Sequence, residues 1–301
     1  MKGPLKPLSY SIVIATDQRP AELRGTLQSI AIQSRQPARV MVVDASPDTH
    51  SSEVCADFRA KLPLQWVAAE RRSSARQRNQ GAAVVAEPLI VFLDDDVILP
   101  AGVMESLAQV FDNDDAGQTG GVAARIDGMQ HSPPGRLLRL YYRLQAGFAH
   151  RDYSGRLFGP AINCLPCYSE ADPDLIPADW LNSTCTMYRT ALFRREQFPR
   201  FEGYSAMEDV HLSARIARTH RLYFHKHATY THLGAPSSHK RDFRGIARMK
   251  IANQRRVAHE VMGLRGWRLG WGLTLHRLFV SVYLLRTRPA GWREAIRGTW
   301  N

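Results

Sequence analysis

The first 125 residues of the chain alternate between short apolar segments rich in β-branched residues and longer segments that suit helices. The apolar segments span residues 10–15, 40–43, 64–67 and 89–93, and the helical segments span residues 20–33, 51–61, 74–86 and 100–111. Alternation at this spacing predicts an α/β fold, with a mostly parallel central sheet and helices on both faces. Pro20 and Pro100 stand where a first helical turn would begin, a position that proline tolerates.

The composition is that of an ordinary globular protein. Of the 301 residues, 44% are hydrophobic and 23% are charged. A chain of this length can bury a core without the help of disulfides or a structural metal. The composition therefore excludes a disordered tail protein, a collagen-like fibre and a disulfide scaffold.

The formal net charge is +12, and most of the excess lies at the C-terminal end. Residues 240–301 contain 14 Lys and Arg but only 3 Asp and Glu, and the rest of the chain is close to neutral. A basic end beside a neutral body is typical of an appendage that binds a surface. It argues against a protein that binds nucleic acid over its whole length.

The cysteines and the N-terminal residues favour a cytoplasmic location. The first 16 residues lack the long apolar segment of a secretory signal, so we expect reduced thiols. Cys164 and Cys167 have CxxC spacing, but no second cysteine or histidine pair completes a zinc site. Chance spacing in a loop is the favoured interpretation, and a zinc or redox site is the alternative.

Regular patterning weakens over residues 127–178, where prolines, glycines and isolated aromatic residues dominate. A segment of this length without clear elements predicts a long variable loop that serves as a lid or binding region. Order returns at residues 180–188. A helix is predicted over residues 208–220 and a strand over residues 222–231.

Acidic residues follow three of the predicted strands where the strands end. Asp17 follows the first, Asp44 the second, and the run Asp94, Asp95 and Asp96 the fourth. Ligands of open parallel sheets bind outside the carboxyl ends of the strands. A single aspartate there is explained equally well by a helix cap or a turn. Three consecutive carboxylates repel one another, which predicts a bound cation, and their oxygens suit Mg²⁺ or Mn²⁺.

The motifs of two common nucleotide-binding folds are absent from the sequence. The turn after the first strand has no GxGxxG pattern, and GxxxxGK[ST] occurs nowhere in the chain. A Rossmann dinucleotide fold and a P-loop ATPase are therefore disfavoured. A diphosphate can still be bound by a metal and by arginines of the segment 71–78, although Arg71 and Arg72 are better explained as a solvated surface.

Four sequence blocks resemble family 2 glycosyltransferases, which have the GT-A fold. The first is SIVIATDQRPAELRGTLQSIAIQ followed by VMVVDAS, and the second is SSARQRNQGAAVVAEPLIVFLDDDVILP, with an Arg-Asn-x-Gly helix and a strand ending in a DxD motif. The third and fourth, DWLNSTCTMYRTALF and GYSAMEDVHLSARIART, resemble the acceptor-side half. The resemblance covers roughly residues 8–125 and 178–235 and implies a GT-A-type fold that transfers sugars from nucleoside diphosphates.

The resemblance also implies which residues bind the donor and the metal. Asp44 would accept a hydrogen bond from the nucleotide base, and Thr16 would lie beside the base or ribose. The implied donor-binding residues are Thr16, Asp44, Arg78, Asn79, Asp94 and Asp95, with Asp95 in the variable middle position of the motif. The implied metal ligands are Asp94, Asp96 and His232. A structural or solvated histidine is the alternative for His232.

The Glu-Asp pair of the fourth block implies the catalytic residues, with Asp209 as general base and Glu208 beside it. The implied reaction is a single displacement with inversion, in which an acceptor hydroxyl attacks the anomeric carbon as the nucleoside diphosphate leaves. A helix N-terminus lowers the pKa of Asp209, which makes it a weaker base. We expect burial or Glu208 to raise this pKa again. The alternative is that the pair only favours the start of the helix.

The donor and acceptor are only partly constrained by the sequence. Asp44 suits hydrogen bonding to a uracil or thymine imide, so UDP or dTDP is favoured over GDP. The turn at residues 182–187 lacks the glycine-rich pattern of relatives, so acceptor identity does not carry over. A saccharide or lipid-linked acceptor is expected from the family. Arg125 and Asp127 either line the cleft or form a plain turn.

Residues 240–301 form a basic, tryptophan-rich region that we expect to be helical. Its longest apolar run, residues 271–285, includes a histidine and an arginine and is shorter than the roughly 20 residues needed to span a bilayer. Tryptophan and arginine beside short apolar stretches suit a helix in the membrane interface. Each basic residue near anionic lipid contributes about 1 kcal/mol. We expect peripheral binding at the inner face of the plasma membrane, and a helical pair packed on the catalytic domain is the alternative.

The sequence thus predicts a donor-binding half over residues 1–125, an acceptor-side half over 126–239 and a basic helical extension over 240–301. The predicted function is metal-dependent, inverting glycosyl transfer in bacterial polysaccharide or glycolipid synthesis. A haloacid-dehalogenase-type phosphatase also has Asp-x-Asp after a buried strand, but normally after the first strand. A nucleic-acid-binding protein, the second alternative, needs basic and aromatic residues on a sheet face or recognition helix.

Overall fold

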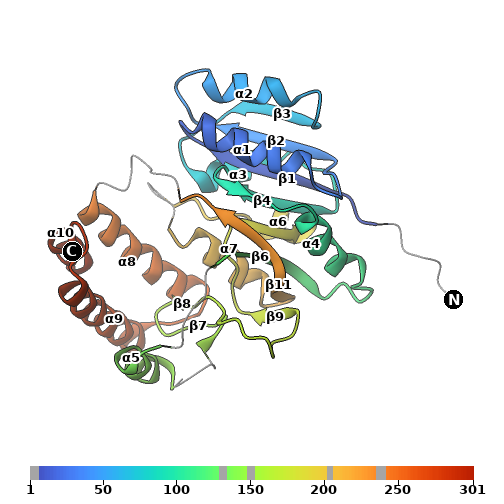
Figure 1. Cartoon of the computed structure of the whole chain (residues 1–301). Helices are drawn as coiled ribbons and strands as arrows, with labels where there is room; N and C mark the ends of the chain where they lie inside the picture. Colours follow the sequence, from blue (N-terminus) through green and yellow to red (C-terminus); the bar gives the residue numbers. More distant parts are fainter. Residues whose placement is uncertain (1–6, 129–133, 148–152, 202–205, 235–241) are drawn as a thin grey trace.

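The computed structural model describes residues 7–128, 134–147, 153–201, 206–234 and 242–301 (Figure 1). Its first four strands are β1 (Tyr10–Thr16), β2 (Arg39–Asp44), β3 (Leu64–Ala68) and β4 (Leu89–Asp94). They lie side by side in the order β3-β2-β1-β4 and are parallel. All four predicted strands are confirmed, and each extends at most a residue or two beyond its predicted range.

The sheet continues beyond β4 with strands from the acceptor-side half. Strand β10 (Cys185–Arg189) runs antiparallel between β4 and β6 (Thr119–Ile126), and β11 (Arg221–His232) is parallel to β6. The short strands β5 (Val97–Ile98) and β9 (Leu175–Ala178) pair antiparallel with β11. Strands β3, β2, β1, β4, β6 and β11 therefore share one direction, which confirms a mostly parallel sheet. This sheet runs without interruption through the predicted boundary at residue 125.

Helices cover both faces of the sheet because successive strand residues point to opposite sides. Ile12 and Ile14 of β1 face a core with α1 (Pro20–Ala31), α2 (His50–Phe58) and α4 (Val103–Asp112). Val13 faces a second core with α3 (Ser74–Ala82), α6 (Thr190–Glu196) and α7 (Glu208–Ile216). The predicted α/β class with helices on both faces is confirmed.

Two helix boundaries differ from the predicted ones. Pro20 opens α1 as predicted, but α4 begins at Val103 rather than at Pro100. Gly102 precedes α4 with φ +91°, a left-handed conformation that glycine adopts easily, and this places the first turn after the proline. The predicted helix over residues 208–220 ends at Ile216, four residues early.

The segment 127–178 is more regular than predicted. It contains α5 (Arg136–Ala146) and a hairpin of β7 (Leu157–Phe158) and β8 (Ile162–Asn163), as well as β9. Tyr141 of α5 is buried with Phe158, Cys164 and Cys167 in a separate small core. The sequence predicted a long variable loop here, whereas the described part of the segment contains a helix and short strands. All four cysteines are buried and free of disulfides, and the CxxC pair belongs to this core.

The C-terminal region consists of α8 (Phe243–Glu260), α9 (Gly266–Thr287) and α10 (Trp292–Trp300), which stack at one end of the molecule (Figure 1). The predicted helical character is confirmed, while the predicted boundary at residue 239 lies outside the described residues. Val257 of α8 and Leu273 of α9 are buried against Val210 of α7. No helix among the described residues is long and apolar enough to cross a membrane.

Candidate active site

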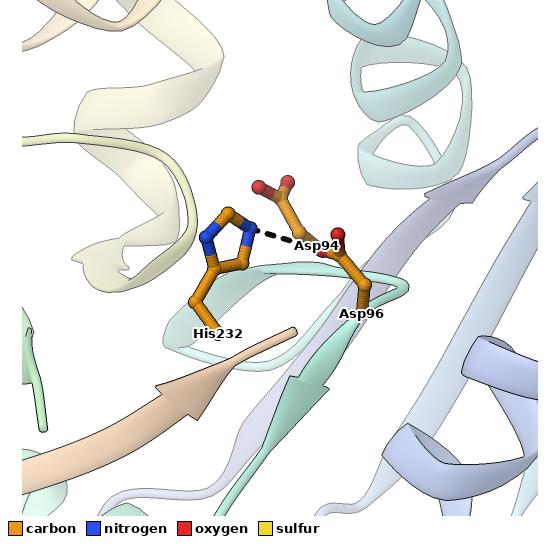
Figure 2. A group of neighbouring side chains, drawn as sticks. All are labelled: Asp94, Asp96 and His232. Carbon is orange, nitrogen blue, oxygen red and sulfur yellow. Dashed lines mark ion pairs between the residues drawn. The ribbon is translucent and has the colours of Figure 1, made fainter. Parts of the chain in front are cut away.

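Three side chains converge beyond the carboxyl end of β4 (Figure 2). Asp94 ends β4, Asp96 lies in the turn before β5, and His232 ends β11. His232 is brought here because it pairs with Val97 in the β5–β11 ladder. Its Nε2 lies 3.1 Å from Oδ1 of Asp96, and ligand atoms of all three residues lie within 4.8 Å of one another. This spread and donor set fit one divalent cation, whose bonds to oxygen and nitrogen are about 2.0–2.2 Å long.

Asp95, the middle residue of the acidic run, has other partners. Thr16 Oγ1 donates a hydrogen bond to its Oδ2 at 2.7 Å, and Arg19 Nη1 contacts its Oδ1 at 2.9 Å. Burial raises the pKa of Asp95 to about 6, and Arg19 and Thr16 oppose this rise. Arg19 also lies 3.4 Å from Asp96 Oδ2. Asp95 is thus paired with β1 and the turn after it, and these contacts offset part of its repulsion with Asp94 and Asp96.

Asp44 ends β2 and lies beside Thr16, its partner in the register of the neighbouring strand β1. Its Oδ1 accepts hydrogen bonds from the backbone and hydroxyl of Ser46, and its Oδ2 accepts one from Trp66 Nε1 at 3.1 Å. Gln77 Nε2 donates to the carbonyls of Thr16 and Val43, both at 2.9 Å. These bonds hold the ends of β1 and β2 in place, with Asp44 and Thr16 on the same edge.

Arg78 connects the acidic run with the Glu-Asp pair. Its Nη2 lies 2.6 Å from Asp94 Oδ1, and its Nη1 lies 3.2 Å from Glu208 Oε1. The guanidinium is buried and its carbon lies 5.5 Å from the ring centroid of Phe198. A single cation on α3 therefore joins the end of β4 to the start of α7.

Asn79, the neighbour of Arg78, contacts protein backbone rather than the acidic run. Its Nδ2 donates to the carbonyl of Phe198 at 2.9 Å, and its Oδ1 accepts from the amide of the same residue at 3.0 Å. The amide thus fixes the segment that carries Phe198 against α3. Both of these contacts are with the backbone of Phe198, and the donor-binding role implied by the resemblance stays a prediction.

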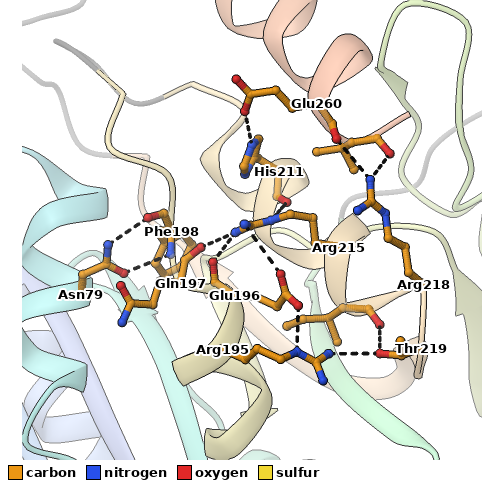
Figure 3. Close-up of polar contacts among 12 residues, drawn as sticks. Asn79, Arg195, Glu196, Gln197, Phe198, His211, Arg215, Arg218, Thr219 and Glu260 are labelled. Atoms are coloured by element: carbon orange, nitrogen blue, oxygen red, sulfur yellow. Dashed lines mark hydrogen bonds and ion pairs between the residues drawn. The ribbon is translucent and has the colours of Figure 1, made fainter. Parts of the chain in front are cut away.

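A polar network extends from this segment through α7 to α8 (Figure 3). Arg215 of α7 donates to the carbonyls of Glu196 and Gln197. His211 Nε2 of α7 lies 3.0 Å from Glu260 Oε2 of α8, and Arg218 donates to the Glu260 carbonyl. The helix that begins with Glu208 and Asp209 is therefore held by α3, α6 and α8 together.

Glu208 and Asp209 form the first turn of α7, which follows an unusual backbone conformation. Met207 has φ +72°, in the left-handed region that is strained for residues other than glycine, and such strain clusters at functional sites. The amide of Val210 donates to Asp209 Oδ1 at 2.8 Å. The first three residues of this sequence block, 203–205, lie outside the described residues.

The ionisation of both carboxyls is perturbed. Burial and the neighbouring Asp209 raise the pKa of Glu208 despite the opposing charge of Arg78. Burial also raises the pKa of Asp209, against the hydrogen bond from Val210 and the charge of Arg78. The rise in the pKa of Asp209 through burial thus outweighs the lowering effect of the helix N-terminus. Asp209 as a whole residue is half-buried, whereas Glu208 is buried.

A small hollow lies beside the end of β6. Arg125, Tyr168 and Asn182 contribute to its lining, and the guanidinium carbon of Arg125 lies 4.7 Å from the ring centroid of Tyr168. Arg125 Nε and Asn182 Oδ1 are buried without a hydrogen-bond partner in the described part of the chain. Arg125 therefore lines a hollow, whereas Asp127 is exposed in a turn.

Sequence reasoning missed several polar residues that shape the site. Arg19 lies in the turn after β1 and contacts Asp95. The only sequence signal for this contact was that Arg19 follows a predicted strand. Gln77 and Trp66 hold the strand ends, and their roles depend on the register of β1, β2 and β3. Arg72 remains about half exposed and pairs with Asp17, in agreement with the predicted solvated surface.

The chain matches a family model described as glycosyltransferase-like family 2 over residues 7–252. A search among curated proteins finds no match. Three solved structures share the fold at low sequence identity. TarS from S. aureus (residues 1–349) has 17% identity and a TM-score of 0.54, over 95% of this chain and 74% of that one.

The other two structures contain bound ligands. The mannosyltransferase PcManGT from Pyrobaculum calidifontis, in complex with GDP-Man and Mn²⁺, has 15% identity and a TM-score of 0.56, over 99% of this chain and 85% of that one. GalNAc-T7 with UDP, GalNAc and Mn²⁺ has 14% identity and a TM-score of 0.58, over 80% of this chain and 48% of that one. These likenesses confirm the GT-A fold.

Proposed function

The chain belongs to the glycosyltransferase-like family 2, and from this premise we propose that it transfers a sugar, with inversion and with the help of a divalent metal, from a nucleoside diphosphate to a saccharide or lipid-linked acceptor. The proposed context is bacterial polysaccharide or glycolipid synthesis. Family membership gives the enzyme class as glycosyl transfer, in preference to the phosphatase and nucleic-acid alternatives.

The observation that carries the proposal is the arrangement around Asp94. The group of Asp94, Asp96 and His232 lies at the carboxyl end of β4, and Arg78 joins it to Glu208 at the start of α7. A diphosphate at the first group would therefore lie close to the carboxylates of the second. Leaving group and proton acceptor need this proximity for a single displacement.

Each residue has a distinct task in the proposed reaction. A Mn²⁺ or Mg²⁺ ion bound by Asp94, Asp96 and His232 supplies positive charge to the diphosphate. Asp209 accepts the proton of the acceptor hydroxyl, since its raised pKa makes it a stronger base than an ordinary aspartate. Arg78 holds Asp94 and Glu208 in their positions. The imidazole of His232 favours Mn²⁺ over Mg²⁺, because nitrogen ligands suit transition metals.

The proposed donor is a UDP- or dTDP-sugar, bound with its base near Asp44 and Thr16. Both Asp44 oxygens already accept hydrogen bonds, but a carboxylate has further lone pairs for a base imide. Complexes of the similar structures contain UDP, UDP-GlcNAc or GDP-Man. The proposed acceptor side lies beside Arg125, Tyr168 and Asn182, which line a small hollow next to the end of β6.

The proposed location is cytoplasmic, with the basic region 240–301 at the inner face of the plasma membrane. Its support is the excess of Lys and Arg there and the exposed side chains of Trp267 and Trp271. Arginine and tryptophan on exposed helices are typical of proteins that lie on anionic bilayers.

A thermal-shift panel tests the donor site. UDP, dTDP, GDP and CMP are added with and without Mn²⁺, and we expect one diphosphate to raise Tm in a metal-dependent way. Asp96→Ala should remove the metal-dependent part, while Asp57→Ala, at an exposed pair with Arg24, should keep it. The proposal is wrong if no nucleoside diphosphate stabilises the protein, or if Asp96→Ala retains the full metal-dependent shift.

A further inference from the structure

Helix α9 carries a continuous apolar stripe that faces away from the protein. Trp267, Trp271, Leu278, Val282 and Leu285 are exposed by 76, 64, 49, 41 and 49%. At about 100° per residue these five positions fall within roughly 60° of one another around the helix. Because α9 has 22 residues, the stripe is about 30 Å long. Exposed apolar surface of this extent marks an interaction site.

Helix α5 carries a second exposed stripe. Leu137, Leu140 and Leu144 are exposed by 41, 55 and 59%, and their spacing places them on one side of the helix. Tyr141, which points to a different side, is buried. Helix α5 lies in the segment 127–178, so this stripe belongs to the acceptor-side half rather than to the C-terminal region.

The two helices pack against each other side by side. The ring of Tyr141 stacks on Phe279 with a centroid distance of 4.0 Å, and its hydroxyl lies 2.6 Å from His276 Nδ1. One turn further along α5, Gln145 donates to the carbonyl of Gly272 at 3.0 Å. A later residue of α5 thus contacts an earlier residue of α9, so the two helices are antiparallel.

The remaining sides of the helices decide where the two stripes point. Tyr142 of α5 packs on Tyr153 and Phe158, and Leu273 of α9 is buried against α7. Around each helix, the residues of the α5–α9 contact lie between the stripe and these buried residues. The stripe is therefore on one side of the contact, and the buried residues are on the other. In an antiparallel pair this puts both stripes on the outer side, away from the protein. We call this surface, made of the five α9 and three α5 residues named above, the α5–α9 face.

The charge around the α5–α9 face has a single sign. The helices contain six arginines, which are Arg136, Arg139, Arg143, Arg268, Arg277 and Arg286, and neither contains an aspartate or glutamate. On α5 the exposed Arg136 and Arg143 lie next to the leucines. A second copy of the same face would bring like charges together, whereas an anionic lipid surface matches both the charge and the exposed apolar side chains.

We propose that the α5–α9 face docks onto an anionic lipid bilayer, so that the acceptor-side half and the C-terminal region contact the membrane together. The inference rests on the proposed membrane association of residues 240–301 and adds α5 to it. Docking in this way would hold α5 of the acceptor-side half at the bilayer that would carry a lipid-linked acceptor. Neither helix needs to cross the membrane.

Vesicle flotation of the full-length protein tests the proposal, with vesicles of phosphatidylcholine alone or with added phosphatidylglycerol. One variant replaces the α5 leucines (L137S, L140S, L144S) and another replaces α9 residues (W267S, W271S, L278S). The control replaces two exposed apolar residues elsewhere, Ile32 and Val84, which are exposed by 63 and 51%. Point substitutions are preferred to truncation near Gly263, because Leu269 and Leu273 are buried in a core shared with α7.

We expect binding only to the anionic vesicles, and a drop of at least tenfold in partitioning for each stripe variant but not for the control. Unchanged melting and nucleotide-dependent shifts would show that the variants fold. If the α5 variant floats like the unmodified protein while the α9 variant does not, the joint face is wrong although membrane association stands. If the unmodified protein binds neither vesicle, both are wrong, and glycosyl transfer is still judged by the nucleotide panel. A dimer in light scattering that both stripe variants disrupt would assign the face to a second copy.

Discussion

At the scale of single residues, the guanidinium of Arg78 connects the acidic run at the end of β4 with the Glu-Asp pair at the start of α7. It is buried, and each of its two Nη atoms faces a carboxylate from a different half, Asp94 or Glu208. The positive charge of Arg78 opposes the rise in the pKa of Glu208 that burial causes, and it offsets part of the repulsion between Glu208 and Asp94. Removal of Arg78 would leave Glu208 buried without its ion-pair partner, and Asp94, whose side chain is 28% exposed, without its contact at 2.6 Å.

We therefore expect Arg78→Met to lower the free energy of unfolding by about 3–5 kcal/mol, the usual cost of removing one partner of a buried ion pair. Arg24→Met is the matched control, because Arg24 pairs with Asp57 at 2.8 Å on the surface. Such an exposed pair contributes about 0–1 kcal/mol. Urea titrations of both variants measure the difference, and equal stabilities would contradict the buried bridge.

The proposed base makes a prediction about pH. Only ionised Asp209 can accept a proton, and burial raises its pKa above the ordinary value of about 3.9. As pH falls, kcat should therefore decline through the raised pKa of Asp209, at a pH above the ordinary carboxylate range. A pH–rate profile from nucleoside diphosphate release measures this limb. A profile that stays flat down to pH 4 would rule Asp209 out as the base.

Replacement of the same residue separates catalysis from donor binding. Asp209→Asn should reduce turnover by about 10²–10⁴-fold, the usual contribution of a general base, because an amide cannot accept the proton. The metal-dependent nucleotide shift should remain, since Asp209 lies outside the group of Asp94, Asp96 and His232. Loss of the shift together with turnover would instead indicate a structural role for Asp209.

At the scale of elements, helix α3 positions the donor side because it packs closely on the sheet. Gly81 permits this approach: a Cβ there would lie 2.6 Å from Val13 Cγ1 and 3.0 Å from Val43 Cγ2. Gln77 and Arg78 lie one turn earlier on the same helix. Their reach to the strand ends therefore depends on the distance between α3 and strands β1 and β2.

Gly81→Ala should lower stability by about 1–3 kcal/mol through overpacking, and it should weaken nucleotide binding as α3 moves outward. Gly270→Ala on α9 is the control, because a Cβ there meets nothing within 4 Å. Alanine in an exposed helix is more stable than glycine by about 0.5–1 kcal/mol. Opposite shifts in Tm for the two variants are expected, and a stabilising Gly81→Ala would contradict the close packing.

At the scale of the whole molecule, the C-terminal helices share a core with the catalytic half. Val210 and Ala214 of α7 are buried together with Val257 of α8 and with Leu269 and Leu273 of α9. His211 and Glu260 add a polar contact between α7 and α8. The packed helical pair and the membrane-binding region, which the sequence offered as alternatives, are thus compatible, because one side of α9 is buried and another is exposed.

Shared packing predicts that the chain unfolds as one unit. Four of the six tryptophans, Trp267, Trp271, Trp292 and Trp300, lie in the C-terminal helices, so the fluorescence of a variant with Trp66 and Trp180 replaced by phenylalanine reports on this region. Far-ultraviolet circular dichroism reports on the whole fold. We expect the urea transitions of both signals to coincide, as cooperative unfolding requires. An earlier fluorescence transition would mean that residues 240–301 unfold separately, as the predicted three-part division would allow.

The sequence by itself determined the parallel half of the sheet and the residues at its strand ends, because alternation and strand-end position are local properties of the chain. Asp94 and Asp96 were singled out in this way, whereas His232, 136 positions after Asp96, was proposed only from the family resemblance. Only the tertiary structure decided that Asp95 turns to Thr16 and Arg19, that Asn79 holds Phe198, and that α5 exists as a helix against α9. These features depend on register and on packing between distant segments, which no local pattern of residues encodes.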